Sequence, residues 1–376
     1  MIQKKKIKLK PAGKKLLLLL SSIVVLFIFV FGFIQYQKSR LYSLGYSKRA
    51  VQQIMHRLKW NDVVAIGKNK TVNAAFESQD YQEKNLDSYT KIEYQKQKDI
   101  IKNINTLLKK GYKVSEISLI LSRGDNEAVS AFAKRDKVAY LDEFFSIPYS
   151  KLENYDRYLA YQNLENEDVE TTVLLVNMGF DKEDYVDPMV ISTFDEQVLV
   201  NKHRQLSEDY TPTSLVDVPS EMTKTTDTVK VQKSVLQAFE KMANAALQDN
   251  VYLLIGSGYR TYQEQQEIVD TYLKTYGQNY VDRYLPRPGF SEHQTGMSID
   301  VASKVSNVFV ESKEYEWMMD NAYLYGFILR YPKSKEEITG YKCEAWHYRY
   351  VGEKIAKYMK EHNMTYDEYY IEFLDR

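Results

Sequence analysis

The segment SEHQTGMSIDV, residues 291–301, holds a loop pattern that runs directly into a strand pattern. Apolar and polar residues alternate over residues 297–301, which is typical of a β-strand with one buried face. Gly296 stands where the loop must turn into the strand, and glycine adopts unusual backbone conformations at little cost. The segment therefore predicts that a loop delivers His293 and that the following strand delivers Asp300.

Helices and strands surround this segment without regular alternation. A buried strand is expected over residues 251–256, and it turns through residues 257–260 into a helix that starts at Thr261. We expect further strands over residues 198–202, 327–331 and 346–351, further helices over residues 230–247 and 314–325, and two short C-terminal helices. This mixture predicts an α+β domain over residues 195–376, with a small antiparallel sheet and flanking helices.

The composition of the 376-residue chain is that of a globular protein, with 44 % hydrophobic and 27 % charged residues. Lys plus Arg and Asp plus Glu both number 51, so the formal net charge is zero. This balance argues against nucleic-acid binding through bulk charge, and we expect no nucleic-acid partner. Cys343 is the single cysteine, which excludes an intrachain disulfide framework and a cysteine-rich metal site.

The N-terminal residues have the pattern of a membrane anchor. Seven lysines and no acidic residue occur within residues 1–15, and the 19 residues from Leu16 to Ile34 carry no charge. A helix of that length rises ~28 Å, close to the ~30 Å of a bilayer core. No small-x-small cleavage site follows it. We therefore expect a cytoplasmic tail over residues 1–15, a transmembrane helix over residues 16–35 in the lipid bilayer, and an extracellular remainder.

Residues 36–194 are predicted to be mainly α-helical and carry no catalytic pattern. A glycine followed by an aromatic residue recurs at Gly45, Gly111 and Gly179, each time after an apolar run and before a polar helix start. The pattern indicates helix-turn-helix units, as in a degenerate repeat with irregular periods. The region is interpreted either as a plain helical spacer or as a module that binds the cell wall or a partner.

Two of the five histidines lie in dense polar contexts that suit a metal site. His293 and Asp300 share the loop-strand segment, and His347 follows Trp346 in the segment EAWH. Catalytic zinc is held by three protein ligands drawn from imidazole nitrogen and carboxylate oxygen, with the fourth position left open. His293, Asp300 and His347 would form such a set, although a histidine beside a tryptophan is, taken alone, more often a packed structural residue.

Glu344 lies three residues before His347. In an extended segment, side chains alternate between the two faces, so these two residues share a face only if the chain turns or bulges between them. If it turns, the Glu344 carboxylate can stand beside the metal without binding it. A carboxylate in that place can take a proton from an attacking water molecule and pass it to the leaving amine.

These motifs together resemble the VanY-type zinc D-alanyl-D-alanine carboxypeptidases. S-x-H-x-x-G-x-x-x-D at residues 291–300 and E-x-W-H at residues 344–347 match the family signature, and SGYRTYQEQ at residues 257–265 matches its upstream block. The resemblance covers residues 195–376. The chain departs from the family pattern at Ser298, Cys343 and Ala345, and none of these departures removes a ligand.

The resemblance implies a role for each site residue. His293, Asp300 and His347 would bind Zn²⁺, Glu344 would be the catalytic base, and Arg260 would polarise the scissile carbonyl and stabilise the oxyanion. Arg260, Gln265 and Ser291 would contact the substrate. Cys343, next to the base, is interpreted as a packed neutral thiol.

The implied enzyme removes the C-terminal D-Ala from peptidoglycan stem peptides. It would be a single-pass protein of the cell membrane, with its catalytic domain outside the cell at the wall. An L,D-carboxypeptidase that trims tetrapeptide stems and a peptidoglycan endopeptidase on the same scaffold are the alternatives. A catalytically inactive wall-binding protein would require a missing ligand, and none is missing.

Overall fold

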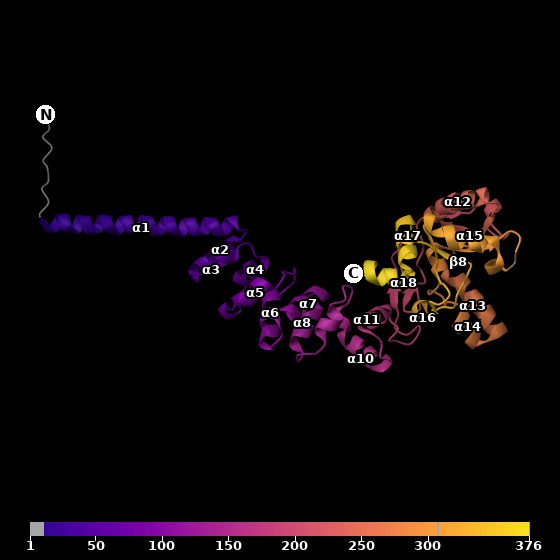
Figure 1. Cartoon of the computed structure of the whole chain (residues 1–376), viewed down its shortest axis with the longest axis horizontal. Helices are drawn as coiled ribbons and strands as arrows, with labels where there is room; N and C mark the ends of the chain where they lie inside the picture. Colours follow the sequence, from indigo (N-terminus) through magenta and orange to yellow (C-terminus); the bar gives the residue numbers. More distant parts are fainter. Residues whose placement is uncertain (1–10, 307, 376) are drawn as a thin grey trace, which may run out of the picture. The chain divides into compact units, whose positions relative to one another are not determined.

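The computed structural model describes residues 11–306 and 308–375 of the chain (Figure 1). They divide into two compact units, with the division between Ser146 and Ile147. The boundary expected from the sequence, at residues 194 and 195, therefore falls inside the second unit. Residues 1–10 of the expected cytoplasmic tail lie outside the described residues.

The first unit begins with α1, a helix from Pro11 to Ser43. The segment Leu18–Ser43 contains a stretch long and apolar enough to cross a membrane, and an N-terminal signal sequence has the same features. The helix extends well beyond the residues 16–35 expected for the span, because its polar C-terminal part packs on the unit. Leu41 is fully buried there, and α1 contacts the helices α2 (Lys48–His56) and α3 (Trp60–Ile66).

The predicted helical character of this part of the chain is confirmed. Polar side chains cap several helices: Ser47 accepts a hydrogen bond from the amide of Ala50, and Asp125 accepts one from the amide of Ala128. The remaining helices of the first unit are α4 (Lys70–Glu77), α5 (Leu86–Lys91), α6 (Ile100–Lys109), α7 (Val114–Arg123), α8 (Asn126–Lys134) and α9 (Leu141–Phe145). The second unit begins with α10 (Tyr155–Glu165) and α11 (Val169–Met178).

The three glycine-aromatic pairs end three helices in the same way. Gly45, Gly111 and Gly179 have positive φ angles of 85°, 82° and 99°. In each turn the glycine amide bonds the carbonyl three residues earlier, and the amide of the following aromatic residue bonds the carbonyl five residues earlier. This is the Schellman arrangement, for which glycine is favoured because it adopts a positive φ without strain.

A hydrogen-bond network also occurs twice along the helical region. In each copy an asparagine accepts hydrogen bonds from a tyrosine hydroxyl and from a second asparagine, and donates one to a backbone carbonyl. In that order, the residues are Asn105, Tyr89, Asn85 and Asp80 in the first copy and Asn177, Tyr158, Asn154 and Tyr149 in the second. The same pattern of side-chain hydrogen bonds therefore occurs at two places in the helical region.

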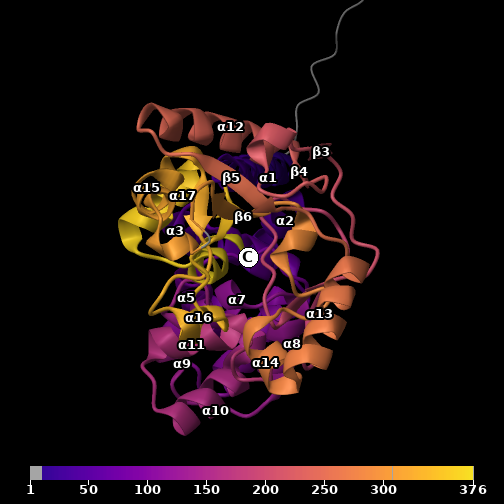
Figure 2. The same cartoon turned by 90° about the vertical axis from the view of Figure 1, so that its right-hand side faces the viewer.

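The second unit is an α+β domain with a four-stranded antiparallel sheet, which confirms the predicted fold class. The strand order is β5 (Leu253–Ser257), β6 (Ser298–Ser303), β8 (His347–Tyr350) and β7 (Phe327–Leu329). Helices α12 (Lys233–Gln248) and α15 (Lys313–Asn321) pack on one face of this sheet, and Figure 2 shows α12 running along β5.

The two faces of the sheet differ in polarity. Apolar side chains such as Ile255, Ile299 and Phe327 join α12 and α15 in a hydrophobic core. Because successive residues of a strand point to opposite faces, Asp300 and His347 point away from that core. The opposite face therefore carries the polar side chains.

Smaller elements surround the sheet. Strands β1 (Met189–Ile191) and β2 (Arg204–Leu206) pair in parallel, and β3 (Leu215–Asp217) and β4 (Lys230–Gln232) pair antiparallel. The helices α13 (Tyr262–Tyr276) and α14 (Gln278–Tyr284) form a hairpin, and α16 (Glu336–Thr339), α17 (Glu353–His362) and α18 (Tyr366–Tyr369) complete the unit. Residues 147–194 are part of it: Lys151 Nζ lies 2.9 Å from Asp375 Oδ2, and Arg204 Nη2 lies 2.8 Å from the same oxygen.

The prediction of a strand over residues 198–202 is wrong. Residues 198–200 are a buried irregular segment. Their carbonyl groups have no partner strand because two arginine side chains bond them instead: Arg349 Nη2 donates to the carbonyl of Val198 at 3.0 Å, and Arg330 Nη2 donates to that of Val200 at 3.4 Å. Buried backbone groups need hydrogen-bond partners, and here side chains supply them.

Candidate active site

Strand pairing brings Asp300 and His347 together. In the register of β6 and β8 these two residues are directly opposite each other. Opposite residues in an antiparallel pair project to the same face, with Cβ atoms about 5 Å apart. His347 Nδ1 lies 3.0 Å from Asp300 Oδ1. The distance of 47 positions in sequence is therefore bridged by the sheet itself.

His293 reaches the same place from a turn of 3₁₀ helix, η4 (Glu292–Thr295). Gly296 ends this turn with a φ of 67°, so the chain turns into β6 as expected. The ring Nδ1 lies 2.6 Å from the carbonyl oxygen of Gly258, which can only accept, so Nδ1 carries the proton. Nε2 then faces Asp300 Oδ1 at 3.4 Å with its lone pair free.

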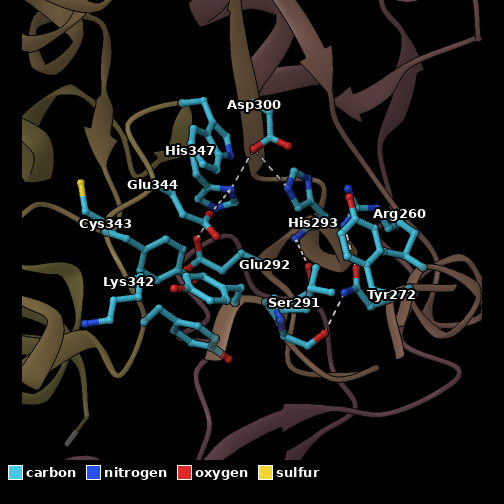
Figure 3. A pocket seen from close by; sticks show the side chains of 18 of the residues that line it. Arg260, Tyr272, Ser291, Glu292, His293, Asp300, Lys342, Cys343, Glu344 and His347 are labelled. Carbon is cyan, nitrogen blue, oxygen red and sulfur yellow. Dashed lines mark hydrogen bonds and ion pairs between the residues drawn. The ribbon is translucent and has the colours of Figure 1, made fainter. Parts of the chain in front are cut away.

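The donor atoms of His293, Asp300 and His347 all lie within 4.8 Å of one another (Figure 3). Two imidazole nitrogens and one carboxylate oxygen are the donor types of a catalytic zinc site. All three side chains turn toward one point (Figure 3). The residues thus fit a zinc ion.

Glu292 holds the other side of the His347 ring and was not singled out from the sequence. Its Oε2 lies 3.4 Å from His347 Nε2 and accepts a hydrogen bond from Ser298 Oγ at 3.0 Å. Its Oε1 accepts one from Arg330 Nε at 2.7 Å and one from Arg349 Nη1 at 3.4 Å. The side chains of Glu292, Arg330 and Arg349 are completely buried. Buried charges require such pairing, because leaving one unpaired costs several kcal/mol.

The network continues from Arg330 to the C-terminal helices. Arg330 Nη1 lies 2.6 Å from Asp367 Oδ2, and Asp367 Oδ1 accepts a hydrogen bond from Asn201 at 3.0 Å. Glu292, Arg330 directly after β7, Arg349 of β8 and Asp367 of α18 therefore form one buried charged cluster, which we call the Glu292 network.

These contacts shift the pKa values of the site. Burial raises the pKa of Asp300, but the two imidazoles outweigh it and hold that pKa well below its usual range. Burial lowers the pKa of His347, but its hydrogen bonds to Asp300 and Glu292 outweigh this and raise the pKa to about 9. Burial lowers the pKa of His293. A metal ion held by these groups requires both imidazoles to be neutral, so its binding releases a proton.

The chain turns between Glu344 and His347, as the proximity of their side chains requires. The amide of His347 bonds the carbonyl of Glu344 at 3.2 Å, and the amide of Glu344 bonds the carbonyl of Tyr331. Glu344 Oε2 therefore lies 3.9 Å from His347 Nδ1, beside the three donors and outside their set. Burial raises the pKa of the Glu344 carboxyl to about 7, which suits a group that exchanges a proton near neutral pH.

The structure places the remaining predicted residues at the same pocket. Arg260 Nη1 donates to Gln265 Oε1 at 2.7 Å, and Arg260 Nη2 donates to Ser257 Oγ at 3.2 Å. The Gln265 amide also donates to the carbonyl of Pro286, so Gln265 fixes Arg260 to the neighbouring loop. Ser291 Oγ accepts from the amide of His293 at 3.4 Å and caps the turn that carries that histidine. Both side chains thus support the site through contacts within the chain.

The pocket has a volume of about 520 Å³, within the usual range for a ligand site. Its lining includes every predicted site residue. Cys343 is half-buried there, and burial raises the pKa of its thiol, which keeps it neutral. Further lining residues not singled out from the sequence are Ile268, Tyr272, Tyr280, Tyr284, Leu285, Pro286, Glu292, Tyr331, Tyr341, Lys342 and Trp346.

The match to a known protein family lies within the second unit. The family model described as D-alanyl-D-alanine carboxypeptidase, VanY, matches residues 228–353. YodJ of Bacillus subtilis (strain 168) is 38 % identical over 179 residues, which cover 46 % of this chain and 66 % of YodJ. The bifunctional D-Ala-D-Ala dipeptidase and D-Ala-D-Ala carboxypeptidase VanXYC of Enterococcus gallinarum is 34 % identical over 180 residues, which cover 46 % of this chain and 92 % of VanXYC. The solved LdcB LD-carboxypeptidase shares 34 % identity, with 50 % of this chain and 92 % of that chain covered and a TM-score of 0.45.

Proposed function

Because this chain belongs to the VanY family of D-alanyl-D-alanine carboxypeptidases, we propose that it removes the C-terminal D-Ala from peptidoglycan stem peptides with the help of a zinc ion. The observation that carries the proposal is the convergence of three metal donors, a neighbouring carboxylate and a half-buried arginine on one pocket. His293 Nε2, Asp300 Oδ1 and His347 Nδ1 would hold the ion. When bound, it would act as a Lewis acid toward the peptide carbonyl and activate a water molecule.

Residues of the chain would carry the proton transfers. Glu344 stands beside the donors at 3.9 Å from His347 Nδ1, close enough to accept a proton from the attacking water. The same carboxyl would give that proton to the amine of the departing D-Ala, so that the carboxylate is regenerated at the end of the cycle. Proton transfer by a positioned group contributes ~10²–10⁴-fold to the rate.

Arg260 would stabilise the negative charge that develops on the carbonyl oxygen. Its guanidinium is held by Gln265 and Ser257, which bond two different nitrogens of the group. A cation that is fixed before the reaction needs no reorganisation as the charge develops. Burial lowers its pKa, but a guanidinium remains protonated in proteins.

The contacts behind the histidines would keep each imidazole in the tautomer that binds metal. The Gly258 carbonyl holds the proton of His293 on Nδ1, so that Nε2 is free. Glu292 would hold the proton of neutral His347 on Nε2, so that Nδ1 is free. Such partners of metal-binding histidines fix ring orientation and raise ligand basicity.

The helix α1 would anchor the enzyme in the cell membrane. The support is its apolar stretch, none of which is buried within the fold, and the lysine-rich residues 1–15 before it. The positive-inside rule then places the N-terminus in the cytoplasm and residues 36–376 outside, where the wall substrate lies. Residues 36–194 would form a helical spacer or binding region before the catalytic residues of 195–376.

The test is mass spectrometry of products made by the full chain in detergent. Substrates are a stem pentapeptide ending in D-Ala-D-Ala, a tetrapeptide ending in one D-Ala, and a cross-linked dimer, each with and without a chelator. We expect loss of one D-Ala from the pentapeptide, abolished by the chelator and by Glu344→Ala. Cleavage of the tetrapeptide alone would make the protein an L,D-carboxypeptidase, cleavage of the cross-link an endopeptidase, and chelator-resistant activity would refute the zinc assignment.

A further inference from the structure

Four tyrosines of the α13–α14 hairpin form an exposed aromatic row, which we call the tyrosine row. Tyr272 and Tyr276 lie one turn apart on α13, and Tyr280 and Tyr284 lie one turn apart on α14. Ring centroids are 5.5 Å apart between Tyr272 and Tyr276, 4.7 Å between Tyr276 and Tyr280, and 4.8 Å between Tyr280 and Tyr284. In chain order the four residues are 37 %, 59 %, 37 % and 43 % exposed.

Aromatic side chains are normally buried to a large extent, because each removes a large apolar area from water. Here four rings contact one another at the surface, stacked in the pairs Tyr272–Tyr280 and Tyr276–Tyr280 and tilted in the other two. Contiguous exposed apolar patches on a soluble unit mark sites that bind a ligand or partner. The row therefore requires an occupant that benefits from flat, uncharged rings bearing hydroxyl groups.

The tyrosine row is continuous with the candidate active site. Tyr272, Tyr280 and Tyr284 line the same pocket as His293 and Glu344. Figure 3 places Tyr272 next to Arg260, on the opposite side of the pocket from Glu344. A substrate whose end lies at the metal donors would therefore pass along these rings as it leaves the pocket on this side.

We propose that the tyrosine row binds the sugar rings of the glycan strand to which the stem peptide is attached, an inference that rests on the proposed function. A stem of five residues spans at most ~18 Å when extended, so the sugar follows the peptide closely. N-acetylated pyranose rings present apolar C–H faces that stack on aromatic rings, and their hydroxyl and amide groups pair with tyrosine hydroxyls. The enzyme would thus recognise a stem peptide together with its saccharide.

The charge of the row favours this occupant over others. The four rings are uncharged, as is the glycan backbone away from its peptide. A bilayer surface with anionic lipids attracts clusters of Lys and Arg, and the row itself supplies none. A second stem peptide from a neighbouring strand carries ionised groups, which would gain little from neutral rings.

The experiment compares two substrates that differ only in the sugar. The full chain in detergent cleaves either a stem pentapeptide carrying its disaccharide or the same pentapeptide without it, and KM is measured for each. We expect the sugar to lower KM about tenfold in the wild type, which corresponds to ~1.4 kcal/mol. In the double variant Tyr276→Ala/Tyr280→Ala, the ratio of the two KM values should fall to near one.

Two further variants separate ring stacking from other effects. Tyr276→Phe/Tyr280→Phe keeps both rings and should retain most of the preference for the sugar-bearing substrate. Tyr252→Ala removes another exposed tyrosine, which is outside the pocket lining, and should leave the KM ratio at its wild-type value. A wild-type ratio of one, or an unchanged ratio in the double alanine variant, would overturn the proposal.

Binding of a peptide-free chito-oligosaccharide tests the row even if neither peptide is cleaved. Calorimetry should detect binding of the N-acetylglucosamine pentamer to the full-length Glu344→Ala variant. The triple variant, which also carries Tyr276→Ala and Tyr280→Ala, should show no binding. If the variant with intact tyrosines does not bind the saccharide, or if both variants bind it equally, glycan recognition by the row is refuted. A sugar-free cross-linked peptide that binds in a tyrosine-dependent way, while the saccharide does not, would reassign the row to peptide. If the enzyme binds the saccharide but cleaves neither peptide, only the proposed reaction is refuted, and the glycan proposal stands.

Discussion

Replacing Glu292 by glutamine changes one buried oxygen into an amide nitrogen and leaves the shape of the side chain nearly the same. The amide oxygen of Glu292→Gln must face Arg330 and Arg349, because guanidinium groups only donate hydrogen bonds. Its NH₂ group then faces His347 Nε2, where the wild type has a carboxylate oxygen at 3.4 Å. A donor in that position favours the tautomer of His347 whose proton lies on Nδ1.

That tautomer cannot bind metal through the nitrogen that faces Asp300. His347 must either shift its proton back against the amide or lose its place as a ligand. Removing the carboxylate partner of a metal-binding histidine typically costs 10–100-fold in metal affinity. We therefore expect the dissociation constant for zinc to rise by that factor, or ~1.4–2.7 kcal/mol.

The substitution also unbalances the Glu292 network. Arg330 keeps Asp367 at 2.6 Å, and Arg349 keeps the carbonyl of Val198 at 3.0 Å, so neither guanidinium is left without a partner. Removing one partner of a buried charge pair costs about 3–5 kcal/mol. With these remaining partners we expect a loss near the lower end, ~3 kcal/mol in the free energy of unfolding of the second unit.

Asp367→Asn is the matched control. Asp367 belongs to the same buried network, but it bonds Arg330 and Asn201, and neither of these is a metal donor. It should lower stability by a similar amount and leave the zinc affinity unchanged. Competition with a chromophoric chelator measures the affinity, and urea unfolding followed by near-ultraviolet circular dichroism measures the stability. If Glu292→Gln binds zinc as tightly as Asp367→Asn, Glu292 only stabilises the fold and does not set the tautomer.

Three further outcomes follow from the same geometry. His293→Ala should bind little zinc in metal analysis, and near-stoichiometric zinc would remove it from the ligand set. Glu344→Ala should retain zinc while kcat falls at least ~10²-fold, and loss of metal would instead make Glu344 a ligand. Burial raises the pKa of Asp375, but Arg204 and Lys151 outweigh it and lower that pKa, so its stabilising effect is present at neutral pH and lost as the pH falls below about 4. Asp375→Asn should therefore lower the free energy of unfolding by ~2 kcal/mol at pH 7 and by progressively less as the pH falls below about 4, and a loss that does not change with pH would contradict the ion pair.

The strands of the catalytic unit were predictable where apolar alternation reflects the sheet. Residues 297–301 alternate because one side of β6 meets the hydrophobic core and the other meets the polar face. The strand predicted over residues 198–202 was wrong because an apolar, buried segment need not pair with another strand. That segment is apolar and buried like a strand, yet arginine side chains bond its carbonyls, and composition does not distinguish a strand partner from an arginine.

The candidate ligands were predictable because the metal needs imidazole donors, and the chain has only five histidines. The position of Glu344 beside the metal donors required a turn between Glu344 and His347, and their spacing in the sequence did not show whether the chain turns there. The structure shows the turn, through the bond between the amide of His347 and the carbonyl of Glu344. The register that pairs Asp300 with His347 depends on contacts between strands far apart in sequence, and a single sequence does not contain it.

Glu292 shows why the surroundings of a site are harder to predict than its ligands. In the sequence it is an unremarkable acidic residue before His293, of the kind that usually faces water. Its partners Arg330 and Arg349 are 38 and 57 positions away. The available signal was in those arginines: each lies in or next to a short strand of apolar and aromatic residues, where an unpaired charge could not be buried. Two arginines buried in or next to strands require a buried acid, and the sequence places an acid directly before His293. Glu292 therefore both neutralises the buried arginines that stabilise the fold and orients His347. The stability of the sheet and the geometry of the metal site depend on each other for this reason.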